Sequence, residues 1–138
     1  MFVQRKIKLE DNSRLQIRAL TTKEPLLWLA SQPDEKDHYR QSVYLINQTG
    51  HKLDSVYFYS NSIITVDEQA YGSGNNGRYY MDVECGEAIQ VEQVDLIYDS
   101  DLIIELHLKI SATKLGEETF RHTIKKGKIK DKVLLWKD

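Results

Sequence analysis

The sequence lacks the residues that mark disulfide-rich, zinc-binding and membrane-spanning proteins. Cys85 is the single cysteine among 138 residues, which excludes an intrachain disulfide and a zinc site built on several thiolates. No segment approaches the ~18 consecutive apolar residues of a membrane-spanning helix. Residues 1–6 lead into alternating polar positions rather than the apolar block of a secretory signal. We therefore expect a cytoplasmic protein without a membrane partner.

An excess of one charge sign is also missing. The 19 basic and 21 acidic side chains give a net charge of -2, so the whole molecule has no general attraction to nucleic acid. We expect no nucleic-acid partner. A chain of this length with 41% apolar residues can fill one core, which predicts a single domain over residues 1–138.

The charges are nevertheless segregated along the chain. Residues 82–105 hold eight acids and no lysine or arginine, whereas residues 121–132 hold six bases and one acid. Such opposite fields can pair within the molecule, join two copies or select a charged partner. Alternatively, Lys125–Lys132 is a hairpin whose lysines protect an exposed strand edge from pairing with another chain.

Alternation of apolar and polar residues is the clearest pattern in the sequence. Leu102–Ile110 has apolar residues at every second position, which is typical of a half-buried strand. Leu15–Ala19 and Val56–Ser60 alternate in the same way, with Tyr57 and Tyr59 on the polar side of the second segment. Further segments of strand length, rich in Val, Ile, Tyr or Phe, are residues 3–9, 41–47, 78–84, 89–97, 118–124 and 129–136. We expect about nine strands.

Two segments depart from simple alternation. In residues 22–31 the helical spacing of the apolar residues predicts one short helix or an irregular connection. In residues 89–97 the apolar phase changes between Val91 and Val94, which predicts a β-bulge near Gln93.

Turn residues recur at a spacing typical of antiparallel sandwiches and barrels. Packing two sheets face to face is the simplest way for these strands to bury their apolar sides, so we predict an all-β antiparallel β-sandwich. The turn-linked strand pairs resemble immunoglobulin-like or fibronectin-like modules in architecture. The antibody framework of two cysteines around a tryptophan cannot form, because Cys85 is alone.

Motifs that carry catalysis or hold a cofactor are not present in the sequence. It contains no HExxH and no Gly-x-Ser-x-Gly, and the glycines of residues 72–77 lack the lysine and following helix of a phosphate-binding loop. Cys85 is flanked by Glu84 and Glu87, whose negative field opposes formation of a thiolate. We expect no enzyme activity, no cofactor and no metal centre.

Two short polar motifs have simple alternatives. Asp95, Asp99 and Asp101 approach one another near a predicted turn and could supply oxygen ligands to calcium, although a solvated turn explains them equally well. Asn47-Gln48-Thr49 fits an acceptor for N-linked glycan, but we expect this match to be accidental without a secretory signal.

His107 and His122 lie on successive predicted strands and could meet across a hairpin. Direct opposition would put Phe120 and Ile124 on the wet face, because opposite residues of an antiparallel pair share a face. A one-residue shift places Phe120 and Ile124 opposite the buried row of residues 106–110. The apolar pattern therefore predicts no histidine pair and leaves His122 on the inner face as a hydrogen-bonded residue.

The segment Asp67–Arg78 is rich in glycine and asparagine and predicts a long loop. Connections of this length in compact domains are usually mobile or used for binding. Tyrosine, asparagine and arginine offer flat faces together with adaptable donors and acceptors. The candidate binding residues are Tyr71, Asn75, Asn76, Arg78, Tyr79 and Tyr80.

The sequence thus predicts a scaffold without a catalytic constellation. We expect a non-enzymatic protein–protein interaction module, whose partner is another protein or a second copy of the chain, bound through the loop, a strand edge or the acidic segment. The alternative is a carbohydrate- or small-ligand-binding module that uses loop 67–80, with Tyr71, Tyr79 and Tyr80 as stacking platforms. A plain flexible hairpin tip also fits the loop. The outward Tyr57 and Tyr59 offer a further aromatic surface for a protein or a sugar.

Overall fold

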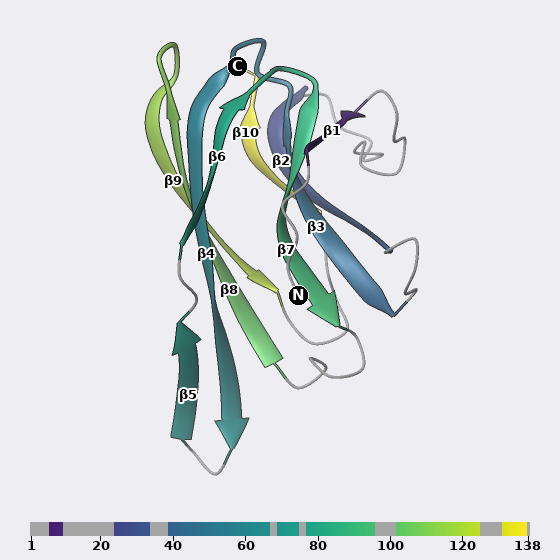
Figure 1. The fold of residues 1–138 in the computed structure, drawn as a ribbon, viewed down its shortest axis with the longest axis vertical. Helices are drawn as coiled ribbons and strands as arrows, with labels where there is room; N and C mark the ends of the chain where they lie inside the picture. The colour runs from purple at the N-terminus through teal and green to yellow at the C-terminus, as the bar shows by residue number, and fades with distance from the viewer. Residues whose placement is uncertain are drawn as a thin grey trace.

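The computed structural model describes residues 6–9, 24–33, 39–66, 69–74, 77–95, 102–124 and 131–137. These residues form ten β-strands in two antiparallel sheets, with no α-helix among them (Figure 1). The predicted all-β fold is confirmed. The strand predicted at Leu15–Ala19 lies outside the described residues.

Each sheet has five strands. Sheet A has the order β1-β7-β3-β2-β10, with β1 (Lys6–Lys8), β7 (Glu87–Asp95), β3 (Arg40–Asn47), β2 (Pro25–Pro33) and β10 (Lys132–Trp136). Sheet B has the order β5-β4-β8-β9, with β5 (Gln69–Gly74), β4 (Leu53–Val66), β8 (Leu102–Ala112) and β9 (Gly116–Ile124). Its fifth strand, β6 (Arg78–Val83), pairs with residues 53–58 of β4, and β5 pairs with residues 61–66 of the same strand edge.

The main core lies between the two sheets. Alternation decides which residues enter it: in β8, residues 104, 106, 108 and 110 are buried, while Ile103 and Lys109 are exposed and Glu105 and His107 are half-buried. Val43 and Leu45 of β3 join the β8 residues in one apolar cluster, so both sheets contribute to it. The half-buried strand predicted at Leu102–Ile110 is confirmed.

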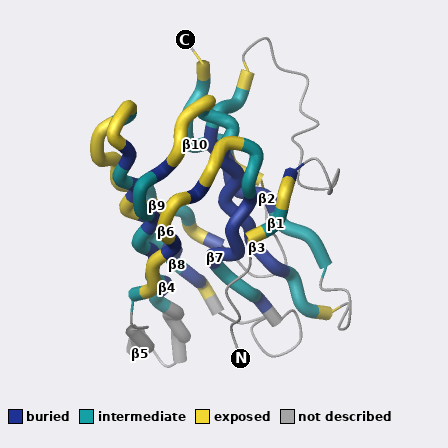
Figure 2. The backbone as a smooth tube through the Cα atoms, turned by 45° about the horizontal axis from the view of Figure 1, so that its top comes forward, coloured by how far each residue is buried: buried dark blue, intermediate teal, exposed yellow. Residues whose placement is uncertain are grey.

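Sheet A also buries its outer face. Trp28 and Ala30 of β2 alternate with inward Leu27 and Leu29, and they form a second apolar cluster with residues of β3, β7 and the chain after β1. Figure 2 shows the dark blue of buried residues running along β2 and β3. The members of this outer cluster are Leu9, Trp28, Ala30, Tyr44, Ile46 and Ala88.

The short helix predicted within residues 22–31 is wrong. Pro25–Pro33 is a strand, which pairs with β3 on one side and β10 on the other. Because both faces of this strand are buried, its apolar residues are consecutive instead of alternating. A run of that kind also contains the helical spacing that suggested a helix.

The long loop predicted over Asp67–Arg78 is also wrong. Residues 69–74 of the segment are β5, which pairs as a hairpin with the end of β4, and β6 begins at Arg78. The glycines of β5 lower its intrinsic strand propensity, so the sequence pattern concealed a strand that pairing with β4 stabilises.

The predicted β-bulge is confirmed, two residues before the expected position. In the β3–β7 ladder, Val43 pairs with Glu92 and Tyr44 pairs with Gln90, so Val91 is the extra residue. The bulge lets Ile89, Val91 and Val94 all be buried despite their opposite phases.

The predicted register of β8 and β9 is confirmed as well. His122 lies opposite Leu106 and His107 opposite Arg121, so the two histidines do not face each other. The next connection differs from expectation: β9 belongs to sheet B and β10 to sheet A, so the chain between them crosses from sheet to sheet rather than closing a hairpin.

A lysine joins the sheets on each side of the sandwich. On one side, Lys6 Nζ of β1 donates to the carbonyl oxygens of Met81 (2.6 Å) and Asp82 (3.1 Å) in β6. On the other, Lys132 Nζ of β10 donates to the carbonyl oxygen of Arg121 in β9 (3.5 Å). Carbonyl groups of two strands at the edges of sheet B are therefore already engaged.

Asn47, at the end of β3, organises one end of the sandwich. Its side chain is fully buried, and Nδ2 donates to the carbonyl oxygens of His51 (2.9 Å) and Val83 (3.0 Å). Its Oδ1 accepts hydrogen bonds from the backbone nitrogen and the hydroxyl of Thr49. These bonds satisfy a buried amide and hold the turn between β3 and β4 against the end of β6.

Candidate functional site

Two adjacent candidate residues, Tyr79 and Tyr80, point to opposite sides of sheet B. Tyr80 is 5% exposed, stacks on Phe58 with ring centroids 5.4 Å apart, and donates its hydroxyl to the carbonyl oxygen of Gln90 (2.7 Å). It is therefore a core residue that links β6 to sheet A, not the surface stacking platform that we predicted. Tyr79 is 60% exposed on the outer face.

Of the other candidates, Arg78 is the one whose side chain lies within the described part of the chain. Arg78 is exposed at the start of β6, opposite Phe58 of β4. Tyr71 lies on β5 opposite Ile64. Asn75 and Asn76 lie outside the described residues.

The structure instead assembles a row of rings on the outer face of sheet B. Tyr57 of β4 lies between Tyr79 of β6, at a centroid distance of 4.7 Å, and Tyr59 of the same strand, at 5.8 Å. Tyr59 in turn stacks on His107 of β8, with centroids 4.5 Å apart and planes 3° from parallel. We call the surface formed by Tyr57, Tyr59, Tyr79, Met81 and His107 the tyrosine face. Its members come from three neighbouring strands.

The sequence had indicated part of this face. The prediction that Tyr57 and Tyr59 point outward is confirmed, since their neighbours Val56, Phe58 and Ser60 are buried. The pairing of Tyr59 with His107 was missed, because it depends on the register between β4 and β8. That register joins residues 48 positions apart, and no local pattern specifies it.

Gly77 fixes the position of the Tyr57 ring. A Cβ atom at Gly77 would collide with Oη, Cζ and Cε2 of Tyr57, so the ring lies directly against the backbone there. Only glycine allows this approach without moving the ring. The Tyr57 ring is thus held between Gly77, Tyr79 and Tyr59, and a ring fixed in this way would lose little conformational entropy on contact with a ligand.

Charges of both signs border the rings. Oε1 of Glu105 lies 2.6 Å from Nε2 of His107 and 3.5 Å from Nε of Arg121. Nε2 of His107 is buried and makes no hydrogen bond with the described residues, in spite of its closeness to this oxygen. Next to them, Lys109 pairs with Glu117 at 3.4 Å. A partner would meet an aromatic surface flanked by two carboxylates, Glu105 and Glu117, and two cations, Lys109 and Arg121.

A second charged group lies at the far end of the same face. Lys52 Nζ is 3.3 Å from Asp82 and 3.9 Å from Asp54, and its pairing with Asp82 raises the pKa of Lys52. The hydroxyl of Thr113 donates to Oδ2 of Asp54 at 2.7 Å, and this bond lowers the pKa of Asp54. All of these side chains are solvent-exposed, so each pair contributes little to stability.

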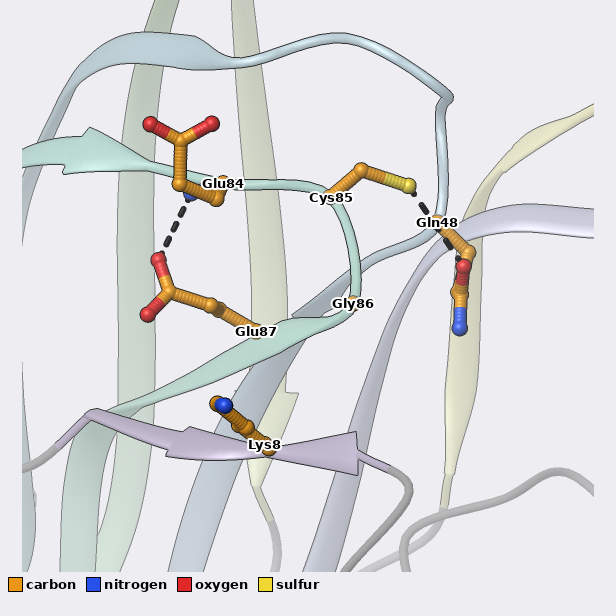
Figure 3. A pocket seen from close by; sticks show the side chains of 6 residues that line it. All are labelled: Lys8, Gln48, Glu84, Cys85, Gly86 and Glu87. Carbon is orange, nitrogen blue, oxygen red and sulfur yellow. Dashed lines mark hydrogen bonds between the residues drawn. The ribbon is translucent and has the colours of Figure 1, made fainter.

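A separate hollow of about 400 Å³ lies at the turn between β6 and β7 (Figure 3). In that turn Glu87 Oε1 accepts from the backbone nitrogen of Glu84 (2.7 Å), and Gly86 has φ +89°, a value that suits glycine. The exposed thiol of Cys85 contacts Oε1 of Gln48 at 3.6 Å. Neither a base nor a cation touches the sulfur among these residues, and the hollow offers no built nucleophile.

Among the residues that the structure describes, no group of three or more His, Cys, Asp or Glu side chains is placed to hold a metal ion. The calcium ligands considered from the sequence include Asp99 and Asp101, which lie outside the described residues, and the side chain of Asp95 is not described either.

Comparisons with known proteins add no functional information. No protein-family model, no curated protein and no solved structure matches this chain. Within the described part of the chain, no helix has the length and apolar character needed to cross a bilayer.

Proposed function

We propose that this chain is a non-enzymatic protein-binding module that uses the tyrosine face. One observation carries the proposal: Tyr79 and Met81, on alternate positions of β6, expose 60% and 58% of their surface on the same side of the sheet. Large apolar side chains that share an exposed face beside further tyrosines are typical of protein interaction sites.

The chemistry of the face favours a protein partner. Tyrosine, methionine and arginine are enriched at interfaces, whereas lysine and glutamate are found mainly at the rim. Here the rings and Met81 lie together, and the pairs Lys109–Glu117 and Lys52–Asp82 lie around them. A partner with an apolar patch bordered by charges of both signs would match this arrangement.

The carbohydrate-binding alternative keeps one supporting observation. The exposed ring of Tyr79, backed by Tyr57 at 4.7 Å, could stack on the apolar side of a sugar ring. The tilt of 41° between these two rings makes the platform uneven, so a protein surface suits it better than a flat glycan.

The test compares three forms of the protein. The double variant Tyr79→Ser, Met81→Ser removes the exposed apolar surface, and Tyr39→Ser is a matched control because Tyr39 is also an exposed tyrosine, 40% exposed, just before β3 of sheet A. Partners captured by the natural sequence and by Tyr39→Ser should be lost with the double variant, with affinity falling at least ~10-fold. Equal capture by all three forms would exclude the tyrosine face.

Two further measurements separate the alternatives. Sedimentation at several concentrations identifies a second copy as the partner if the natural sequence dimerises and the double variant does not. A glycan array on which Tyr79→Ser removes a signal would indicate a carbohydrate ligand instead of a protein partner.

We also propose a reducing, cytoplasmic location, because Cys85 is a free and exposed thiol.

A further inference from the structure

An apolar pocket lies on the side of the sandwich where β9 and β10 approach, away from the tyrosine face. Its volume is about 110 Å³. Leu27 and Leu135 of sheet A form one wall, and Ile110 and Phe120 of sheet B form the other, with Leu115 of the β8–β9 turn at the end. The pocket is therefore a gap between the two layers that remains open to solvent.

The sequence of β9 explains why the gap stays open. The residues of β9 that pair with the buried row of β8 face the opposite sheet, and an apolar residue is expected at each of these positions. Glu118 occupies one of them, opposite the buried Ile110, yet it is exposed. A carboxylate on the inner row cannot enter the core unpaired, so the layers do not close over it.

The pocket is thus apolar in its walls and anionic at its mouth. Its size is of the order of the ~150 Å³ apolar cavity that accepts benzene in an engineered protein. Among the described residues that line it, Glu118 is the one that carries a charge. A carboxylate beside apolar walls attracts a cation that carries an apolar group of matching size.

We propose that this pocket binds small amphiphilic cations, with an aromatic or branched aliphatic group between the sheets and an ammonium group beside Glu118. This site lies beyond the proposed protein-binding function, since it uses no residue of the tyrosine face. Glu118 could also serve only to discourage the edge strand β9 from pairing with another chain, as inward charges on edge strands do. In that case the pocket would bind no ligand.

Benzylamine is a suitable probe, with benzyl alcohol and benzoate as neutral and anionic controls. The unmodified protein is titrated with benzylamine, and its amide chemical shifts are followed. Benzylamine should bind with a dissociation constant in the millimolar range, and the largest shifts should lie at Leu115, Gly116 and Phe120. Benzyl alcohol should bind more weakly, and benzoate more weakly still.

Charge variants test the role of the carboxylate. Glu118→Gln should weaken benzylamine about three- to five-fold, the range of an exposed ion pair, and leave benzyl alcohol unchanged. Glu117→Gln is the matched control, because Glu117 is the neighbouring exposed residue whose side chain pairs with Lys109 on the opposite face. It should bind benzylamine as the natural sequence does.

A filling variant protects the test from a folding artefact. Leu115→Phe should reduce binding of both benzylamine and benzyl alcohol, while its circular dichroism remains that of the natural sequence. Three results would overturn the proposal. They are equal affinity for benzylamine and benzoate, shifts centred on the tyrosines of β4 and β6, and concentration-dependent shifts at Leu115 without any probe, which would assign the pocket to a second copy.

Discussion

The outer faces of the two sheets are both formed by antiparallel strands, but the face of sheet A is buried and the face of sheet B is exposed. On sheet A, Trp28 and Ile46 are 4% and 0% exposed and belong to a second apolar cluster. On sheet B, Tyr79 and Met81 are about three-fifths exposed and border charged residues. The first face therefore contributes to stability, whereas the second leaves large apolar side chains exposed to solvent.

The same difference appears in the sequence of the strands. β2 and β3 have consecutive apolar residues because both of their faces are buried, whereas β8 alternates because only one face is buried. In this protein an alternating strand therefore belongs to a sheet whose outer face is exposed to solvent.

The largest expected effect is on the covered face. Trp28→Ala should lower the free energy of unfolding by about 3–5 kcal/mol, because it removes a large buried side chain. Tyr79→Ala on the open face should cost about 1 kcal/mol or less, since it loses mainly its contact with Tyr57. Urea denaturation measures both values.

A second substitution guards this comparison against complete unfolding of the tryptophan variant. Ile46→Val removes one methylene from the covered face and should cost about 1 kcal/mol. Equal costs for Trp28→Ala and Tyr79→Ala would mean that the two outer faces contribute alike, and the distinction between them would be lost.

An intermediate effect is expected at the backbone beneath the tyrosine face. Gly77→Ala forces the Tyr57 ring away, and the cost should be about 1 kcal/mol, at the low end for overpacking, because the far end of a side chain can move. Near-ultraviolet circular dichroism should lose part of its tyrosine signal.

A double-mutant cycle identifies the cause of that loss. If the collision with the ring is responsible, Gly77→Ala should cost much less in a Tyr57→Ser background. An unchanged cost would place the strain in the backbone of Gly77 itself. It would mean that contact with Gly77 does not fix the Tyr57 ring.

The smallest effect concerns the exposed charges around the open face. The Thr113 hydroxyl lowers the pKa of Asp54, so this carboxylate stabilises the folded state above its ordinary pKa and loses that contribution as the pH falls through its lowered value. Thr113→Val removes the hydrogen bond. The melting temperature of the variant should lie slightly below that of the natural sequence at about pH 6 and approach it at about pH 3.

A nuclear magnetic resonance titration of Asp54 provides the direct check. In Thr113→Val its pKa should rise toward the usual range of an aspartate. If the melting temperatures differ by the same amount at both pH values, the threonine acts through packing and not through the carboxylate.

Sequence patterns predicted the structure well where the apolar residues of a strand keep a clear two-residue phase. The alternation in β8, the bulge in β7 and the register between β8 and β9 follow from the phase of apolar residues, and all three are confirmed. The sequence patterns gave wrong predictions at β2, where burial of both faces removes the alternation, and at β5, where glycines lower the strand propensity.

The candidate site was harder to predict than the fold. Tyr79 and Tyr80 are indistinguishable by composition, and only the position of β6 beside β4 separates a surface ring from a core ring. The contact of Tyr59 with His107 depends on two strands that are distant in sequence. Local periodicity assigns a residue to a face, but it does not choose its neighbours across the sheet.

The burial of Asn47 protects the folded chain from deamidation, the slow loss of the side-chain amide of asparagine. Deamidation begins when the backbone nitrogen of the next residue attacks the side-chain amide carbon. Here that nitrogen, from Gln48, is engaged with the carbonyl oxygen of Leu26 at 2.8 Å, and both polar atoms of the amide are bonded as well. The same burial hides Nδ2 from any enzyme that attaches glycan, so the Asn47-Gln48-Thr49 motif should stay chemically silent for as long as the protein is folded.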